Sequence, residues 1–151
     1  MISLFLDSSA LIAGIISAQG EPHLAGRVLL LLSESGHITI TISEQVLAET
    51  ERAIARKVPR ALNDLRQVVQ ASKVLIVRDP SSQDVAAHLG IITHPADVPI
   101  VLAAMHASVD YLVTLNQKHF IADPEVARKS GLRIGTPGDV LNWIRSKIAV
   151  E

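Results

Sequence analysis

The sequence predicts an α/β protein, a three-layer α/β/α sandwich around a central, mostly parallel sheet. Short apolar or β-branched runs alternate with helix-like segments along the chain, an order typical of such sheets. Hydrophobic residues make up 48% of the composition but aromatic residues only 3%, so the core must consist of Leu, Ile, Val and Ala. With 151 residues, the chain is long enough for one core and short for two. We therefore expect one domain over residues 1–151.

The first part of the chain is predicted to form a strand, a short helix, a loop and a longer helix. Gly36 ends the longer helix, since glycine often stands just past a helix end. The predicted segments are Ile2–Leu6, the stretch after Asp7 to about Ser17, Ala18–Pro22, and about His23–Ser35.

The middle of the chain begins with a clear strand pattern. His37–Ile42 alternates with period two and is rich in β-branched residues. Ser43 then caps a helix to about Lys57, and Pro59 opens another to about Ser72. A short strand, Val74–Val77, follows.

The last part of the chain continues the alternation of helices and strands. One helix starts at Asp79-Pro80-Ser81 and ends near Gly90. Next we expect a helix at Pro95–Val109 and then strands at Tyr111–Thr114 and Leu132–Ile134. A C-terminal helix follows Gly135-Thr136-Pro137-Gly138, and we expect its Trp143 to lie in the core.

The composition excludes several classes of function. Fourteen Lys and Arg against 15 Asp and Glu give a formal net charge of −1, so a nucleic-acid footprint would have to be local. Without cysteine there is no disulfide, thiolate zinc site or cysteine nucleophile. The apolar N-terminal run lacks a basic region and is interrupted by Asp7, and no transmembrane run is present, so we expect a cytoplasmic protein with no membrane contact.

Three acidic residues stand where they could share one site. Asp7 ends the first strand, at the sheet edge where ligands bind in open α/β folds, although Asp is also a common helix N-cap. Glu49 projects to the border of the buried face of its helix, where it either faces the site or extends to water or to an arginine such as Arg52 or Arg56. Asp97 precedes a helix with Pro99 in its first turn, so it is either a ligand or a plain cap.

Polar groups after the predicted strand at Tyr111–Thr114 fall at the same edge. Thr114 offers a hydroxyl and Asn116 an amide oxygen, whereas Asp110 starts the strand at the opposite edge and is interpreted as structural. Clustered carboxylates repel one another unless a proton or a cation neutralises them. Oxygen-only ligands suit Mg²⁺ or Mn²⁺, which activate water and stabilise charge at phosphorus. The pattern favours metal-assisted phosphodiester hydrolysis.

Four segments in order resemble the PIN-domain family of metal-dependent ribonucleases. They are Leu6-Asp7-Ser8-Ser9, Ser43-Glu44-Gln45-Val46-Leu47-Ala48-Glu49, Asp97-Val98-Pro99-Ile100-Val101-Leu102-Ala103-Ala104, and Asp110 to Phe120. The resemblance implies a PIN-like fold and an endoribonuclease that hydrolyses RNA with a Mg²⁺ or Mn²⁺ ion held by Asp7, Glu49 and Asp97. It also implies that Ser9 and Thr114 support the site by hydrogen bonding.

Asn116 departs from the family, which usually has a fourth acid there, so the site carries one negative charge fewer. PIN proteins of this length resemble the toxins of toxin–antitoxin pairs, which implies a homodimer and a cognate antitoxin. A catalytically weakened PIN-like module that binds RNA or protein is the alternative that Asn116 favours. A phosphatase or phosphotransferase with Asp7 as nucleophile is a further alternative, although Ser9 stands where such sites usually place a second acid.

Basic side chains and histidines surround the predicted site. Two successive helices carry a cluster of basic side chains, namely Arg52, Arg56, Lys57, Arg60 and Arg66. This cluster either lines a groove that binds phosphates or forms a helix face exposed to solvent. Lys118 lies beside the site. His94 and His119 flank it, and each is either an acid or hydrogen-bond donor to the site or a structural residue. The apolar run Leu29–Leu32 is either core or a dimer or partner surface.

Overall fold

A five-stranded parallel sheet forms the centre of the computed structural model, which describes residues 1–16 and 21–150. The strand order is β3-β2-β1-β4-β5. All four strand pairings are parallel, with Leu4 of β1 opposite Ile40 of β2 and Tyr111 of β4. The strands are β1 (Ile2–Leu6), β2 (Ile38–Ser43), β3 (Leu75–Val77), β4 (Tyr111–Val113) and β5 (Arg133–Gly135). The predicted α/β/α class is confirmed, and the sheet is parallel throughout.

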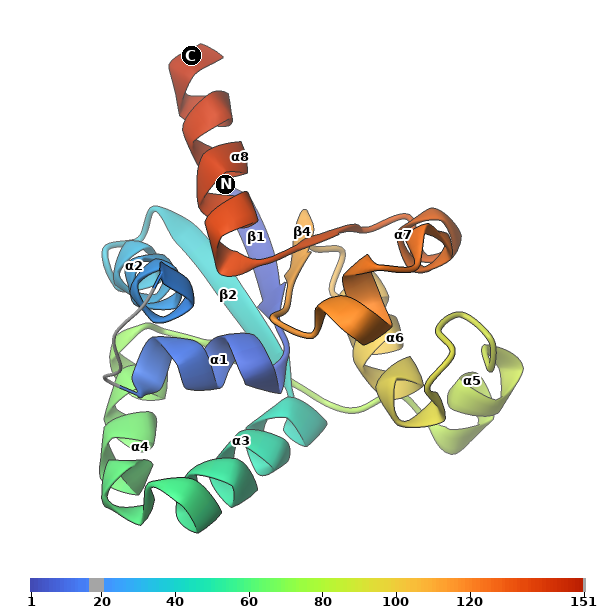
Figure 1. The fold of residues 1–151 in the computed structure, drawn as a ribbon, viewed down its shortest axis with the longest axis horizontal. Helices are drawn as coiled ribbons and strands as arrows, with labels where there is room; N and C mark the ends of the chain where they lie inside the picture. The colour runs from blue at the N-terminus through green and yellow to red at the C-terminus, as the bar shows by residue number, and fades with distance from the viewer. Residues whose placement is uncertain (17–20, 151) are drawn as a thin grey trace.

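Helices cover both faces of this sheet. Figure 1 shows α1, α2 and α4 on one side of the strands and α5, α6 and α7 on the other, while α8 extends away at one end. The α-helices are α1 (Ser8–Ile15), α2 (Glu21–Glu34), α3 (Glu44–Lys57), α4 (Leu62–Ala71), α5 (Ser82–Ala87), α6 (Val98–His106), α7 (Pro124–Ser130) and α8 (Pro137–Val150). Three short turns of other helical types are η1 (Pro59–Ala61), η2 (Pro95–Asp97) and the π-helical η3 (Gln117–Ile121).

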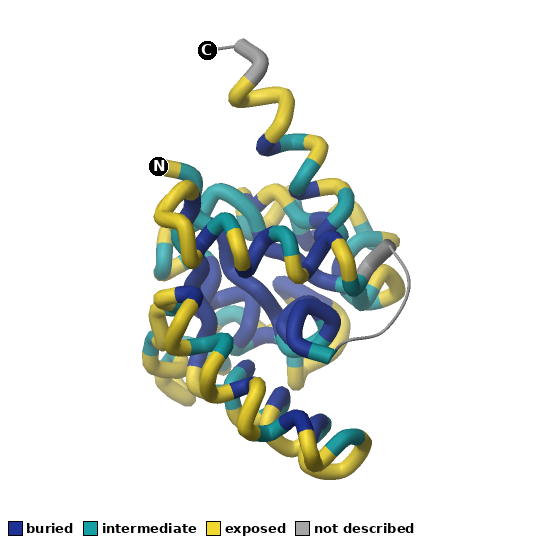
Figure 2. Tube along the Cα trace, turned by 90° about the vertical axis from the view of Figure 1, so that its left-hand side faces the viewer, coloured by how far each residue is buried: buried dark blue, intermediate teal, exposed yellow. Residues whose placement is uncertain are grey.

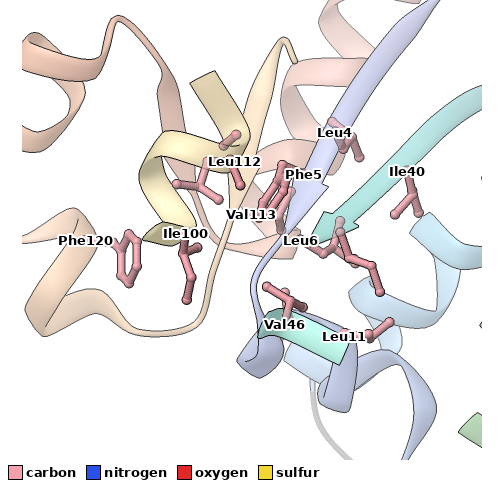
Figure 3. Packing of buried hydrophobic residues seen from close by; sticks show 14 of the residues in the cluster. Leu4, Phe5, Leu6, Leu11, Ile40, Val46, Ile100, Leu112, Val113 and Phe120 are labelled. Atoms are coloured by element: carbon pink, nitrogen blue, oxygen red, sulfur yellow. The ribbon is translucent and has the colours of Figure 1, made fainter. Parts of the chain in front are cut away.

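The core lies between the sheet and its two helix layers. Leu4, Phe5 and Leu6 of β1 are fully buried, as the unbroken apolar run of a central parallel strand requires. Figure 3 shows them between Leu11 of α1 and Ile100 of α6. Figure 2 shows the same layering, with buried segments inside and exposed ones outside, and residues 145–148 of α8 are exposed. None of the helices in the described part is both long and apolar enough to cross a membrane.

Several predicted helix boundaries are wrong, each for a local reason. The segment from Pro59 starts as a 3-10 turn, and α4 begins only at Leu62. The helix predicted from Asp79 to near Gly90 is shorter, because its N-cap is Ser81. The helix predicted at Pro95–Val109 starts with the 3-10 turn η2 and ends at His106, since Ser108 adopts a left-handed φ of 54°.

Two further differences concern the chain near its ends. Glu21 and Pro22 belong to α2, whereas residues 17–20 of the predicted first helix end and loop lie outside the described residues. Trp143 is only partly buried, and it packs against Tyr111 at a ring-centroid distance of 5.4 Å. The run Leu29–Leu32 divides, with Leu29 and Leu30 in the core and Leu31 52% exposed.

The amino ends of the strands carry structural groups. The Ser3 backbone N–H donates to Asp110 Oδ2 at 2.8 Å, which confirms the structural interpretation of Asp110. A cavity of about 800 Å³ lies at this end and includes Ile2, Asp110 and Trp143 in its lining. The predicted acidic site is therefore at the other end of the sheet.

Candidate active site

Asp7 lies at the centre of the candidate site, directly after β1. It is the N-cap of α1, and its Oδ1 accepts a hydrogen bond from the Ala10 backbone N–H at 3.0 Å. The side chain is only 4% exposed, so a carboxylate is held inside the protein at the carboxyl edge of the sheet. The capping and site interpretations of Asp7 are thus compatible, because one oxygen serves the cap while the side chain stays at the edge.

Two hydroxyl groups fix the orientation of Asp7. Ser9 Oγ donates to Asp7 Oδ1 at 2.6 Å, and Thr114 Oγ1 donates to Asp7 Oδ2. Each hydroxyl also accepts a backbone N–H from the segment after β4, Ser9 from Leu115 and Thr114 from Asn116, both at 2.9 Å. The two loops are thereby joined around one carboxylate. With both its oxygens occupied, Asp7 is poorly placed to act as the free nucleophile of a phosphatase.

Burial controls the protonation of Asp7. It raises the pKa of Asp7 above its usual value, and hydrogen bonds from Ser9, Thr114 and Ala10 offset part of this rise. The negative charge of Asp97 raises the pKa further, and contacts through His119, Asn116 and Thr114 link the two acids. A cation at this edge would offset both effects.

Glu49 is brought to the same place by α3. Ser43 caps this helix by accepting a hydrogen bond from the Val46 backbone N–H at 3.3 Å. Six residues on from Ser43, Glu49 is half-buried, and its Oε1 is buried without a hydrogen-bond partner. Burial raises the pKa of Glu49, and Asp97 and Asp7 add to that rise, while Gln45 and Arg52 oppose it. An unsatisfied buried carboxylate oxygen is costly, and a bound cation would satisfy it.

Asp97 enters from the opposite helix layer. It stands at the N-terminus of α6 with Pro99 in the first turn, but its side chain makes no capping hydrogen bond. Asp97 therefore stands at the N-cap position, as predicted, but its side chain does not cap the helix. Its Oδ2 instead lies 3.0 Å from His119 Nδ1, in the segment after β4.

Asn116 and His119 form the remaining wall of the site. Asn116 is the N-cap of η3, where its Oδ1 accepts the His119 backbone N–H at 3.1 Å. Its Nδ2 lies 3.0 Å from His119 Nδ1, the same nitrogen that faces Asp97. Because a carboxylate can only accept, Nδ1 must carry a proton to bond with Asp97, and the amide N–H of Asn116 then has no acceptor there. Asn116 therefore positions His119 through the backbone hydrogen bond, and His119 in turn contacts Asp97.

Gln45 is a residue at this site that the sequence did not single out. Its Nε2 donates to the Ala96 backbone oxygen at 3.1 Å, which ties the start of α3 to the turn that carries Asp97. The available signal was its spacing, since Gln45 precedes Glu49 by four residues and shares its helix face. The basic residues of α3, η1 and α4 named above are all exposed.

The donor set fits a hard divalent cation. Asp7, Glu49 and Asp97 offer only carboxylate oxygens, the ligands that Mg²⁺ and Mn²⁺ prefer. Within residues 1–16 and 21–150, no group of three or more His, Asp or Glu side chains is arranged to hold a metal ion. Asp7 is already held by its neighbours and Asp97 by His119, so ligation would require Glu49 and Asp97 to turn toward Asp7. The partnerless Oε1 of Glu49 has no bond to lose in such a movement.

Comparison with known proteins identifies the fold family. A sequence profile described as the PIN domain matches residues 3–118, which include every residue of the candidate site except His119. The chain belongs to the PIN-domain family. The match covers β1 to the start of η3, and so it contains both loops that meet at Asp7.

Two solved structures show how far the PIN fold extends along this chain. PAE2754 from Pyrobaculum aerophilum is 18% identical with a TM-score of 0.60, and the alignment covers 93% of this chain and 94% of that one. VapBC2 from Rickettsia felis, solved bound to a DNA fragment from its promoter, is 21% identical with a TM-score of 0.60. That alignment covers 88% of this chain and 97% of the Rickettsia chain. No similar sequence was found among curated proteins.

Proposed function

We propose that this protein is a divalent-metal-dependent endoribonuclease. The observation that carries the proposal is the convergence of Asp7, Glu49 and Asp97 at the carboxyl edge of a PIN-domain sheet, where the pKa values of Asp7 and Glu49 are raised. PIN domains are generally nucleases. Three acids that repel one another, with only His119 and Arg52 as basic neighbours among the contacts described above, are suited to binding a cation.

Each residue has a defined part in this proposal. Asp7, Glu49 and Asp97 would hold Mg²⁺ or Mn²⁺, which would supply positive charge against the scissile phosphate and promote attack by water. Ser9 and Thr114 keep Asp7 in place, and His119 keeps Asp97 in place. The exposed basic residues of α3 and α4 provide charge for phosphates farther along an RNA chain.

The test replaces single carboxylates by amides of the same shape. We expect Asp7→Asn, Glu49→Gln and Asp97→Asn each to lower cleavage of a pooled RNA library by about 100-fold or more, because each removes a charge from the metal centre. EDTA should stop cleavage, and Mn²⁺ or Mg²⁺ should restore it. Glu51→Gln is the matched control, since Glu51 is an exposed acid two residues further along the same helix. Full cleavage in EDTA or in Asp7→Asn would refute the metal mechanism.

We also propose a setting for this activity, the toxin of a toxin–antitoxin pair that works in the cytoplasm as a homodimer. The support is the fold shared with VapBC2 and exposed apolar side chains on α2 and β3 that a partner can cover, among them Leu24, Leu31 and Leu75. Expression of the chain alone should arrest growth, and co-expression of a cognate antitoxin should relieve the arrest. Light scattering should give twice the chain mass of 16.2 kDa. A monomer, or normal growth with active nuclease, would contradict this setting.

A second candidate is an RNA-binding or protein-interaction module with weakened catalysis. Asn116 favours it, because an amide stands where the family usually has a fourth acid. This candidate predicts retained RNA binding with no cleavage in Mn²⁺, and gain of cleavage in Asn116→Asp. Cleavage by the unmodified chain would exclude it.

A further inference from the structure

Two histidine rings from separate segments stack beside the acidic site. His94 precedes η2 and His119 lies within η3, and their ring centroids are 3.6 Å apart with an angle of 24° between the planes. The sequence placed both residues near the site but gave no sign that the rings would meet. The stack arises because the segments before α6 and after β4 converge at the same sheet edge as Asp97.

The inner ring of the stack is held firmly. His119 Nδ1 lies 3.0 Å from Asp97 Oδ2, and the His119 backbone N–H donates to Asn116 Oδ1. His119 is the partly buried member, with 24% of its side chain exposed. The plane of His119 is therefore fixed relative to Asp97, and it determines the plane of the ring that stacks on it.

The outer ring has an open face. His94 is an exposed residue, and His119 covers one face of its imidazole, which leaves the opposite face and the ring edge as the parts of the ring that a ligand can reach. The four Phe, Tyr and Trp residues offer no equivalent surface here. Phe5 and Phe120 are buried, and Tyr111 and Trp143 pack against each other.

We infer that His94 is a stacking platform for an unpaired nucleobase next to the phosphate that is cleaved. The inference rests on the proposed ribonuclease function and assigns to His94 the contact with a base that is unpaired at the cleavage site. A base inside a duplex has both faces covered by its neighbours, whereas an unpaired base can lay one face on an aromatic or imidazole ring. Lys118, exposed and adjacent to His119, is placed to contact the phosphate of the same nucleotide.

The test measures stacking directly, with cleavage suppressed by EDTA. A short single-stranded RNA containing 2-aminopurine is titrated with the protein, and its fluorescence quenching and dissociation constant are recorded. We expect His94→Ala to weaken binding by about fivefold or more and to reduce the quenching, in line with the lower range for base–aromatic stacking. His94→Phe should retain both, because it keeps a flat ring without the imidazole nitrogens.

A matched control and a second measurement separate stacking from catalysis. His106→Ala removes an exposed histidine of α6 that pairs with Asp84, so it should change neither quenching nor affinity. In Mn²⁺, His94→Ala should raise KM more than it lowers kcat. Unchanged quenching and affinity in His94→Ala, or equal binding of duplex and single strand, would overturn the inference while leaving the metal mechanism intact. Cleavage that survives EDTA and Asp7→Asn would instead refute the proposed function.

Discussion

At the scale of single residues, the site depends on hydroxyl groups that each make two hydrogen bonds. Thr114 is fully buried, and its hydroxyl donates to Asp7 while accepting the Asn116 backbone N–H. A side chain of this kind orients a metal ligand without touching the ion. Its loss would affect both the carboxylate and the segment that carries His119.

We therefore predict that Thr114→Val weakens both stability and catalysis. The valine has a similar shape but leaves Asp7 Oδ2 and the Asn116 N–H without their partner, at a cost of about 1–3 kcal/mol. Cleavage should fall by about 10–100-fold, as for other residues that orient metal ligands. Urea unfolding and cleavage rates measure the two effects. Thr114→Ser keeps the hydroxyl and should restore most of the activity; equal loss in both variants would contradict the hydrogen-bond account.

Much of this residue-scale site was predictable from the positions of strand ends. Asp7 and Thr114 directly follow neighbouring parallel strands, so the sheet itself brings them together. The position of Glu49 was predictable from the helical periodicity around it, and that of Asp97 from the proline that marks the start of its helix. The stacking of His94 on His119 was not predictable in this way. It depends on the course of two irregular segments in three dimensions.

At the scale of elements, the segment after β4 shows where local sequence signals suffice and where they fail. The helix α7 was missed, although its signals are present: Asp123 as N-cap, Pro124 in the first turn, and Gly131 with a left-handed φ of 72° at its end. The π-helical turn η3 has no comparable local signature. Asn116 caps it, but an Asn cap does not distinguish a π-helical turn from other turns, and the burial of Phe120 in the core is a contact that only the folded chain provides.

The crossing of α1 and α2 provides the element-scale prediction. A Cβ added at Gly26 would lie 3.0 Å from the Gly14 backbone nitrogen and 3.1 Å from its Cα, atoms of a neighbouring helix that cannot rotate away. We expect Gly26→Ala to destabilise the protein by about 1–3 kcal/mol through overpacking, although alanine is the better helix former by about 1 kcal/mol.

Thermal or urea unfolding measures this change. Arg27→Ala is the control, since Arg27 is exposed on the same helix, and it should change stability by no more than about 0.5 kcal/mol. A Gly26→Ala variant as stable as the unmodified protein would show that the two helices have room to separate. Because Asp7 caps α1, a separation of the two helices should also disturb the site.

At the scale of the whole molecule, the acidic site links folding to pH, and the proposed metal would extend that link to divalent cations. Burial raises the pKa of Asp7 and of Glu49 in the folded chain above the ordinary values of 3.8 and 4.5. The folded state therefore binds more protons than the unfolded state just above those values. The contribution of both groups to stability is complete at lower pH and is lost as pH rises through the raised pKa values.

The proposed divalent cation would bind the ionised carboxylates, so its effect on stability should grow over the same pH range. With Mn²⁺ at about 100 times its dissociation constant, linkage gives about 2.7 kcal/mol of stabilisation, or about 5–10 °C in Tm near neutral pH. Thermal unfolding with EDTA or Mn²⁺, from about pH 4.5 to about pH 7.5, should show this difference shrinking toward the acidic end. Asp7→Asn should abolish the Mn²⁺ effect, and Glu51→Gln should retain it. A Tm shift that is independent of pH, or that persists in Asp7→Asn, would place the cation away from the acidic site and leave the raised pKa values without a role in metal binding.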